Sequence, residues 1–328
     1  MLSSMIFLAT LAGPAQVEIA FKGHGGIELP GTLLLPTSAQ RAPAVLLLPG
    51  SGPSDRDGNQ PPTLMTDLLK QLAEALQSKG IATLRFDKRA AHTNARHWPK
   101  DESKLDEFFA FEAFEADAKA ALDFLRTHKS IDPQRVGIAG HSEGGLITAS
   151  LASKYGSDIK AIALLGTAGR KLDAVLVEQV DAILLRQKAS AEVHKGYMAE
   201  LRRAIEYVVA HGRVPQDVPQ GLRALFPPGV GKLLRSYFTL DPTELLTKYS
   251  GSALVLQGEL DVQISGERDF PLLVQALKKR PRGHVEGVLV KAASHNLKAV
   301  SAATEPGFTG PVVPEALDKI VAFLVAQL

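Results

Sequence analysis

A short glycine-rich stretch places one serine in a position to act as a nucleophile. Residues 140–144 read Gly-His-Ser-Glu-Gly and match the pattern G-x-S-x-G around Ser142. The stretch follows an expected strand directly and opens an expected helix, which is the context in which this pattern marks a catalytic serine. Larger side chains at Gly140 and Gly144 would collide with the strand and the helix that meet at such a turn. An ordinary glycine-rich turn is the alternative interpretation.

A serine hydroxyl is a weak nucleophile and needs an adjacent base, most often a histidine. Of the nine histidines, His295 closely follows an expected late strand and falls at the carboxyl edge of the predicted sheet, where catalytic groups gather in open α/β folds. His141 adjoins Ser142 but should point away from it on a sharp turn, so we expect it to pack or to form a hydrogen bond. His92 and His97 fall on a loop that could line a pocket, and we expect them to be solvated. His295 is therefore the candidate base.

A carboxylate beside the base would fix its tautomer and stabilise its charged form. The strand expected over residues 253–257 leads into Gly-Glu-Leu-Asp, and Asp261 is our candidate. Glu259 and Asp269 are the runners-up. Ser142, Asp261 and His295 each follow an expected strand, and this coincidence is much rarer by chance than any one of the three.

Acyl transfer also needs donors aimed at the developing negative oxygen. The residue after the nucleophile, Glu143, should supply one backbone N–H. The second should come from the loop after an early strand, residues 49–53, which reads Pro-Gly-Ser-Gly-Pro. We assign it to the N–H of Ser51, with Gly52 as the alternative. These backbone groups form the candidate oxyanion hole.

Strands and helices alternate along most of the chain and must position these groups. The spacing is that of strand–helix–strand units, which predicts an α/β protein with a doubly wound, mostly parallel sheet and helices on both faces. From about residue 171 to 238 the pattern is mostly helical, and we interpret this segment as a helical cap insertion in one domain over residues 16–328. Within it, Phe226, Tyr237 and Phe238 are expected in the core.

Expected strands cover residues 17–21, 27–35, 44–48, 81–85, 136–139, 159–165, 253–257 and 285–290, and expected helices cover residues 64–76, 113–125, 145–154 and 314–328. On the helix over residues 113–125, Ala116, Ala120 and Phe124 share one face.

Composition excludes several classes of protein. The 328-residue chain carries a net charge of only +2 and no long run of one sign, so it lacks the basic footprint of a nucleic-acid binder. It has no cysteine, which excludes a disulfide scaffold, a thiolate metal site and a cysteine nucleophile. No phosphate-binding glycine loop and no H-E-x-x-H zinc motif occurs. We therefore expect no cofactor and no metal, and only the family resemblance given below implies a small-molecule ester as the partner.

The N-terminus carries an apolar run over residues 5–12, followed by Gly-Pro-Ala. This pattern is typical of a signal-peptide core with a cleavage site, although no basic residue precedes Lys22. Residues 1–15 are accordingly either a signal peptide or a disordered tail, and the location is either periplasmic or secreted, or else cytoplasmic. The run is too short to span a bilayer, and no membrane span is expected.

The loop over residues 50–58 reads Gly-Ser-Gly-Pro-Ser-Asp-Arg-Asp-Gly. With the G-x-S-x-G stretch and the order serine, aspartate, histidine, it resembles the α/β-hydrolase superfamily, and more narrowly bacterial serine carboxylesterases that carry a G-S-G-P-x-D-R-D-G loop. The resemblance implies an α/β-hydrolase fold and hydrolysis of short acyl esters by Ser142, Asp261 and His295. Two departures, Pro-Gly instead of His-Gly at residues 49–50 and a turn without glycines after Arg89, leave the shape of the pocket open. We expect Asp55, Arg56 and Asp57 to pair with Arg85 or Arg89 and so to hold the oxyanion loop.

Other functions remain possible on the same residues. An acyl-CoA thioesterase or acyltransferase would use basic residues of the cap to meet a coenzyme A phosphate, although a solvated helix face is the better explanation of these residues. A peptidase and a non-catalytic binding protein on a hydrolase scaffold are further alternatives. The sequence assigns no oligomeric state. The basic residues of the cap are Arg186, Lys188, Lys195, Arg202 and Arg203.

Overall fold

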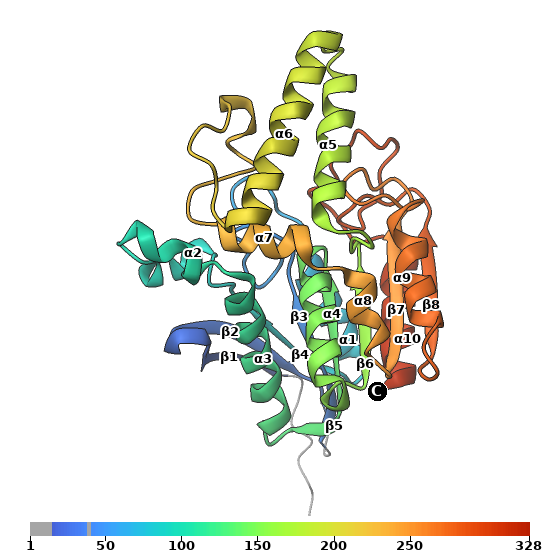
Figure 1. Ribbon diagram of the computed structural model, residues 1–328. Coiled ribbons are helices and arrows are strands. Elements are labelled where there is room, and N and C mark those ends of the chain that lie inside the picture. Colours follow the sequence, from blue (N-terminus) through green and yellow to red (C-terminus); the bar gives the residue numbers. More distant parts are fainter. Residues whose placement is uncertain (1–14, 38–40) are drawn as a thin grey trace, which may run out of the picture.

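An eight-stranded sheet forms the centre of the protein in a computed structural model that describes residues 15–37 and 41–328 (Figure 1). The strand order is β1-β2-β4-β3-β5-β6-β7-β8. The pairs β1·β2 and β2·β4 are antiparallel, and all later pairs are parallel. The carboxyl ends of β3 to β8 therefore meet at one edge. The strands are β1 (Ala15–Lys22), β2 (Glu28–Leu35), β3 (Ala42–Leu48), β4 (Ala82–Phe86), β5 (Ile131–His141), β6 (Ala161–Leu165), β7 (Ser252–Gly258) and β8 (Val285–Val290).

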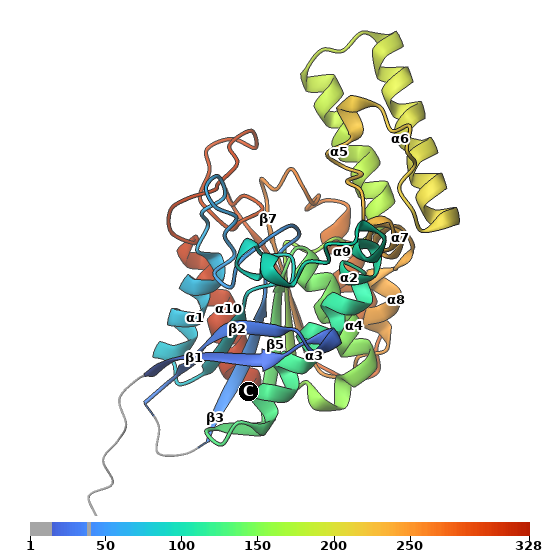
Figure 2. The same ribbon diagram turned by 90° about the vertical axis from the view of Figure 1, so that its left-hand side faces the viewer.

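Helices cover both faces of this sheet (Figure 2). On one face, α1 (Leu68–Ser78) and α10 (Pro314–Gln327) pack against it. On the other face lie α3 (Phe111–Thr127), α4 (Glu143–Tyr155) and α9 (Asp269–Lys278). The central strands are apolar on both sides because each face is buried under helices, which is the pattern of a parallel sheet. The short helix α8 (Pro242–Thr247) completes this layer, whereas α2 (Leu105–Phe108) packs against the later helix Gly231–Thr239.

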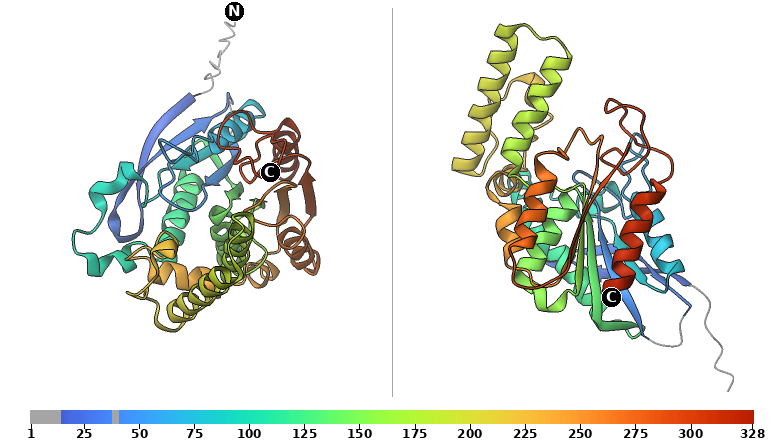
Figure 3. Two further views of the ribbon diagram at one scale, coloured as in Figure 1. Left: turned by 90° about the horizontal axis from the view of Figure 1, so that it is seen from above. Right: turned by 90° about the vertical axis from the view of Figure 1, so that its right-hand side faces the viewer.

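A helical segment lies between β6 and β7 and contains α5 (Leu172–Arg186), α6 (Ala191–His211) and α7 (Gly231–Thr239). We call α5 to α7 the helical insertion. The helices α5 and α6 pack side by side and project beyond the carboxyl ends of the strands (Figures 1 and 3). Apolar residues of α6 at helical spacing, including Leu201, Ala204 and Val208, are fully buried. The insertion thus belongs to the same hydrophobic core as α3 and α4.

Three details differ from the expectations. Leu64 does not belong to α1, because its backbone forms both hydrogen bonds of a bridge with Gln60, and α1 begins at Leu68. In α3 the expected stripe with Phe124 is only half-buried, because apolar residues occur on two sides of this helix and the side with Leu122 and Leu125 meets the sheet. Helix α9, before β8, was not expected.

The apolar N-terminal run expected as a signal peptide or tail lies in residues 1–14, outside the described residues. In residues 15–37 and 41–328 no helix is both long and apolar enough to cross a membrane.

Candidate active site

Ser142 occupies a strained turn between β5 and α4. Its φ of 54° and ψ of −116° are rare for a residue with a side chain. A β-carbon at Gly140 would collide with the Gly144 carbonyl, and one at Gly144 would collide with the carbonyl of Leu48. The backbone N–H of Ser142 donates to the carbonyl of Leu165 at the end of β6, at 2.8 Å. Close packing and this hydrogen bond therefore hold the serine in a conformation that presents its side chain to a pocket.

His295 and Asp261 form a buried pair at the same edge of the sheet. His295 Nδ1 lies 2.7 Å from Asp261 Oδ2. Because a carboxylate only accepts, Nδ1 carries the proton, and Nε2 is left free to act as a base. The backbone N–H groups of Gln263 and Ile264 donate to Asp261 Oδ1 at 2.8 and 2.9 Å. These bonds fix the orientation of the carboxylate and hence that of the imidazole.

Gln257 is a further member of this cluster that the sequence reasoning did not identify. Its Nε2 donates to Asp261 Oδ2 at 2.6 Å and to the carbonyl of Ile264 at 3.0 Å. The sequence feature that could have identified it is a single amide side chain at the end of an apolar strand. In the structure this side chain is fully buried. An amide at such a position must find partners, and it finds the candidate carboxylate.

The strand order brings Ser142 and His295 to neighbouring positions. The backbone N–H of Ser142 is hydrogen-bonded to Leu165, and the next residue, Gly166, lies close to His295. A β-carbon built on Gly166 would be 3.3 Å from His295 Nδ1. Ser142 lines a pocket together with Ser51 and Glu143, which we call the main pocket. His295 lines an adjacent cavity, and Gln263 borders both. In the described part of the chain no hydrogen bond joins the Ser142 hydroxyl to His295. Hydrogen bonds between catalytic groups are often long in unliganded proteins and tighten when substrate binds.

His141 packs beneath the candidate base. Its Nε2 lies 2.9 Å from the carbonyl oxygen of His295, and the two rings are 4.8 Å apart between centroids. Burial lowers the pKa of His141 to about 3, and the neighbouring His295 adds to this shift. His141 is therefore neutral, and its Nε2–H donates to the backbone that carries His295.

The buried His141 should make stability depend on pH. Its pKa is about 3 in the folded chain and 6.5 when unperturbed, so the unfolded state binds one more proton between these values. Stability is then fully present above pH 6.5 and decreases by up to about 1.4 kcal/mol per unit as pH falls toward 3. Urea unfolding at several pH values should show a shallower dependence for His141→Gln. An unchanged slope in His141→Gln would contradict this assignment.

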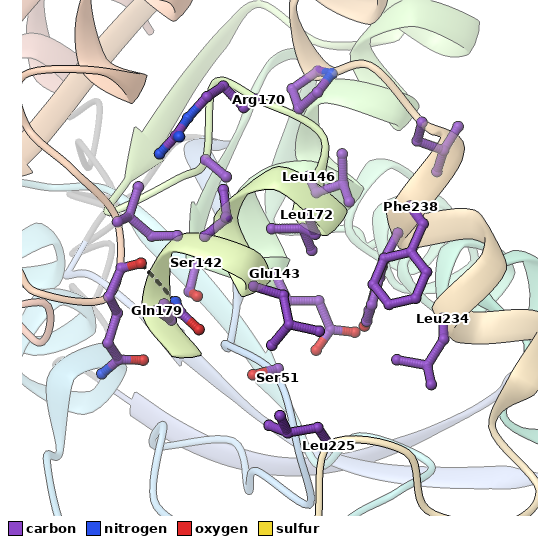
Figure 4. A pocket seen from close by; sticks show the side chains of 18 residues that line it. Ser51, Ser142, Glu143, Leu146, Arg170, Leu172, Gln179, Leu225, Leu234 and Phe238 are labelled. Atoms are coloured by element: carbon purple, nitrogen blue, oxygen red, sulfur yellow. Dashed lines mark hydrogen bonds between the residues drawn. The ribbon is translucent and has the colours of Figure 1, made fainter. Parts of the chain in front are cut away.

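The two candidate oxyanion donors lie on either side of the serine. A β-carbon on Gly50 would lie 3.4 Å from Ser142 Cβ, so the loop after β3 touches the turn after β5. Ser51 and Glu143 both line the main pocket with Ser142 (Figure 4). Within residues 15–37 and 41–328, neither backbone N–H has a hydrogen-bond acceptor. Both groups are thus available to a ligand in the pocket.

The main pocket has a volume of about 220 Å³ and lies beneath the helical insertion. Most of its wall is apolar, and Figure 4 shows the side chains of Leu146, Leu172, Leu234 and Phe238 around it. Tyr237 and Phe238 are buried as expected for core residues, but they also line this pocket, whereas Phe226 is core alone.

The other candidates have different partners. Glu259 is exposed, and Asp269 is bound by the guanidinium of Arg170, with Oδ2 at 2.7 Å from Nη2. His92 is exposed, His97 is half-exposed, and neither lines the main pocket, as expected.

The charged loop behaves partly as expected. Asp57 pairs with Arg85, and Arg56 pairs with Asp87 at 3.0 Å. Of the two alternative partners, Arg85 or Arg89, the loop therefore uses Arg85, and Arg89 is held at 2.7 Å by Asp117 of α3. In the described residues no group of three or more histidine, aspartate or glutamate side chains could hold a metal ion.

The family model described as "Serine aminopeptidase, S33" matches residues 66–210, a range that contains Ser142 but neither Asp261 nor His295. The chain is 26% identical over 253 residues to "Esterase EstD" from Thermotoga maritima; the match covers 77% of this chain and 54% of the relative, so the chain spans about half the length of that protein.

Two solved structures are similar in fold. The esterase from Pyrobaculum calidifontis has a TM-score of 0.58 and 18% identity, with 95% of this chain and 85% of that chain covered. A puromycin-hydrolyzing peptidase from Mycobacterium tuberculosis has a TM-score of 0.60 and 19% identity, with 100% of this chain and 41% of that chain covered. The predicted α/β-hydrolase fold is thereby confirmed.

Proposed function

We propose that the protein is a serine hydrolase that cleaves carboxylic esters through an acyl-enzyme on Ser142. The observation that carries this proposal is the conjunction at one sheet edge of a strained serine facing an apolar pocket and a buried His295–Asp261 pair. No cofactor or metal is part of the proposed mechanism. The relative named as an esterase supports the reaction class.

The proposed reaction begins when an ester binds beneath the helical insertion, which acts as a cap. Ser142 Oγ attacks the carbonyl carbon while His295 Nε2 accepts the hydroxyl proton. The N–H groups of Ser51 and Glu143 stabilise the negative oxygen of the tetrahedral intermediate. His295 then returns the proton to the leaving alcohol, and the acyl group remains on Ser142. Water, deprotonated by His295, releases the acid and restores the serine, with Asp261 orienting the base throughout.

The pocket supports a small acyl group. Its volume of about 220 Å³ exceeds that of a ~150 Å³ cavity that holds benzene and falls below the roughly 300–1,000 Å³ of drug-sized ligand sites. The loop over residues 50–58, which resembles that of bacterial carboxylesterases, agrees with short acyl esters.

A series of p-nitrophenyl esters from acetate to laurate tests this size limit. We expect kcat/KM to be highest for short acyl chains and to fall by about tenfold or more for the longest, because a long chain cannot be desolvated within the cavity. A rate that rises steadily to laurate would contradict the proposed size of the acyl site.

Matched oxygen esters and coenzyme A thioesters of the same acid distinguish the main alternative. We expect the oxygen ester to be the better substrate, since Arg203 of the insertion is already paired with Glu200 at 2.7 Å and with Asp217 at 3.1 Å. Hydrolysis of the thioester alone would favour the thioesterase or acyltransferase alternative instead.

A further inference from the structure

A buried ion pair lies directly behind the two candidate oxyanion donors. Lys88 follows β4, and its Nζ lies 2.8 Å from Glu143 Oε2. Both side chains are almost completely enclosed, at 5% and 3% exposed. The same Nζ lies 3.0 Å from the carbonyl oxygen of Gly50 and 4.8 Å from the centre of the Phe114 ring. One ammonium therefore contacts both the loop after β3 and the residue after the nucleophile.

The sheet order explains why these groups meet. Strand β3 lies between β4 and β5, and all three run parallel. The carboxyl end of β4 leads to Lys88, that of β3 to Gly50 and that of β5 to Ser142, so the three residues line up across one edge of the sheet. The lysine and the serine are thus on opposite sides of the Gly50 loop.

The bond from Lys88 helps to fix the direction of one peptide group, because the Gly50 carbonyl accepts from Lys88 Nζ at 3.0 Å and more weakly from Ser54 Oγ at 3.3 Å. The Gly50–Ser51 bond is trans, and in a trans peptide the C=O and the following N–H point in opposite directions. Because the Gly50 carbonyl is turned toward Lys88, the N–H of Ser51 is turned away from the lysine, and a β-carbon on the same Gly50 would lie 3.4 Å from Ser142 Cβ. The N–H of Glu143 belongs to the residue that holds the lysine.

Stability alone is a weak explanation for such a pair. Burying two charges is costly, and replacing a buried ion pair by apolar residues is often neutral or stabilising. Preorganised donors for a developing oxyanion, in contrast, depend on small differences in backbone orientation.

We propose that Lys88 is a positioning residue which, held by Glu143, orients the Gly50–Ser51 peptide so that the N–H groups of Ser51 and Glu143 converge on one oxyanion beside Ser142. This inference rests on the proposed esterase function and deepens it. Lys88 itself touches no reacting atom; it acts through the backbone of the loop.

The decisive variant is the double replacement Lys88→Met with Glu143→Leu. It removes both charges together, so no buried charge is left without a partner, and the backbone N–H of residue 143 remains. We expect kcat for p-nitrophenyl butyrate to fall about 10²- to 10³-fold, as when one oxyanion donor is lost, with KM changed less than about threefold. The single variant Lys88→Arg keeps the charge and the hydrogen-bond donors, so its kcat should fall less than that of the double variant.

A trifluoromethyl ketone provides the readout that a purely structural role would not change. Addition of the serine hydroxyl to its carbonyl forms a tetrahedral adduct that mimics the oxyanion, so its affinity should fall in parallel with kcat/KM. Lys119→Met is the matched control, because Lys119 also pairs with a carboxylate, Asp123, and lies over an aromatic ring, but contacts neither loop. It should keep wild-type kcat and inhibitor affinity.

The outcomes separate this inference from the proposed function. If the folded double variant keeps kcat within about threefold, or loses kcat without losing inhibitor affinity, the positioning role of Lys88 is wrong while esterase activity stands. If the double variant does not fold, Lys88→Arg becomes the test. Its kcat and its affinity for the ketone must then change by similar factors, and a change in only one of them contradicts the positioning role. If the wild-type protein neither hydrolyses esters nor binds the ketone, the proposed function itself fails.

Discussion

Replacing Ser142 by alanine is expected to lower kcat for ester hydrolysis by several orders of magnitude, with about 10⁶-fold as the ceiling. The reason is that no acyl-enzyme can form without the hydroxyl, while binding and oxyanion stabilisation persist. The fold should survive, because alanine keeps the β-carbon that already occupies this strained turn, with φ of 54°. Steady-state hydrolysis of p-nitrophenyl butyrate, with the melting temperature as a check of folding, measures the effect. A loss smaller than tenfold would exclude Ser142 as the nucleophile.

A fluorophosphonate probe provides an independent control for this variant. The wild-type protein should gain one phosphonyl group on Ser142 Oγ with loss of fluoride, and Ser142→Ala should remain unlabelled by mass spectrometry. Ser157→Ala, at an exposed position remote from the pocket, should keep both labelling and activity. Labelling at another serine would point to a different site.

Asp261→Asn should have the second largest effect, a fall in kcat of about 10⁴-fold. The carboxylate oxygen Oδ1 accepts from the backbone N–H groups of Gln263 and Ile264, which cannot become acceptors. Two backbone donors at Oδ1 outweigh the single amide donor of Gln257 at Oδ2, so the asparagine should place its oxygen at Oδ1 and its NH₂ group toward His295 Nδ1. That contact requires Nδ1 to accept, which moves the proton to Nε2 and removes the base.

The matched control for this substitution is Glu259→Gln. Glu259 was the nearest alternative in the sequence, and its exposed position predicts wild-type kcat. Nitrogen chemical shifts of His295 should report the change of tautomer in Asp261→Asn and none in Glu259→Gln. If Asp261→Asn kept more than a tenth of the activity while Glu259→Gln lost it, the assignment of the carboxylate would be reversed.

Local sequence was sufficient to predict the turn at Ser142 and most of the sheet. A sharp turn between a strand and a helix excludes side chains at Gly140 and Gly144 for steric reasons that act within a few residues. Apolar runs predicted β3, β6 and β7, since strands buried on both faces leave no polar position. Alternation of elements then predicted a parallel sheet, and with it a shared edge for Asp261 and His295, which meet there at 2.7 Å.

The partners of buried polar groups could not be predicted in the same way. Lys88 and Arg89 are adjacent in the sequence, yet one pairs with Glu143 and the other with Asp117. Gln257 looked like the last residue of a strand but donates to the candidate carboxylate.

The sequence by itself predicted the candidate residues for catalysis and that they follow strands, because steric limits and hydrophobic period act over a few neighbouring residues. Only the tertiary structure decided which charge lies behind which loop. That depends on the spatial order of strands, in which β3 lies between β4 and β5, and no local pattern records this order. The contact of Lys88 with Gly50 follows from this order, and the pocket also requires the packing of the helical insertion over the strand ends.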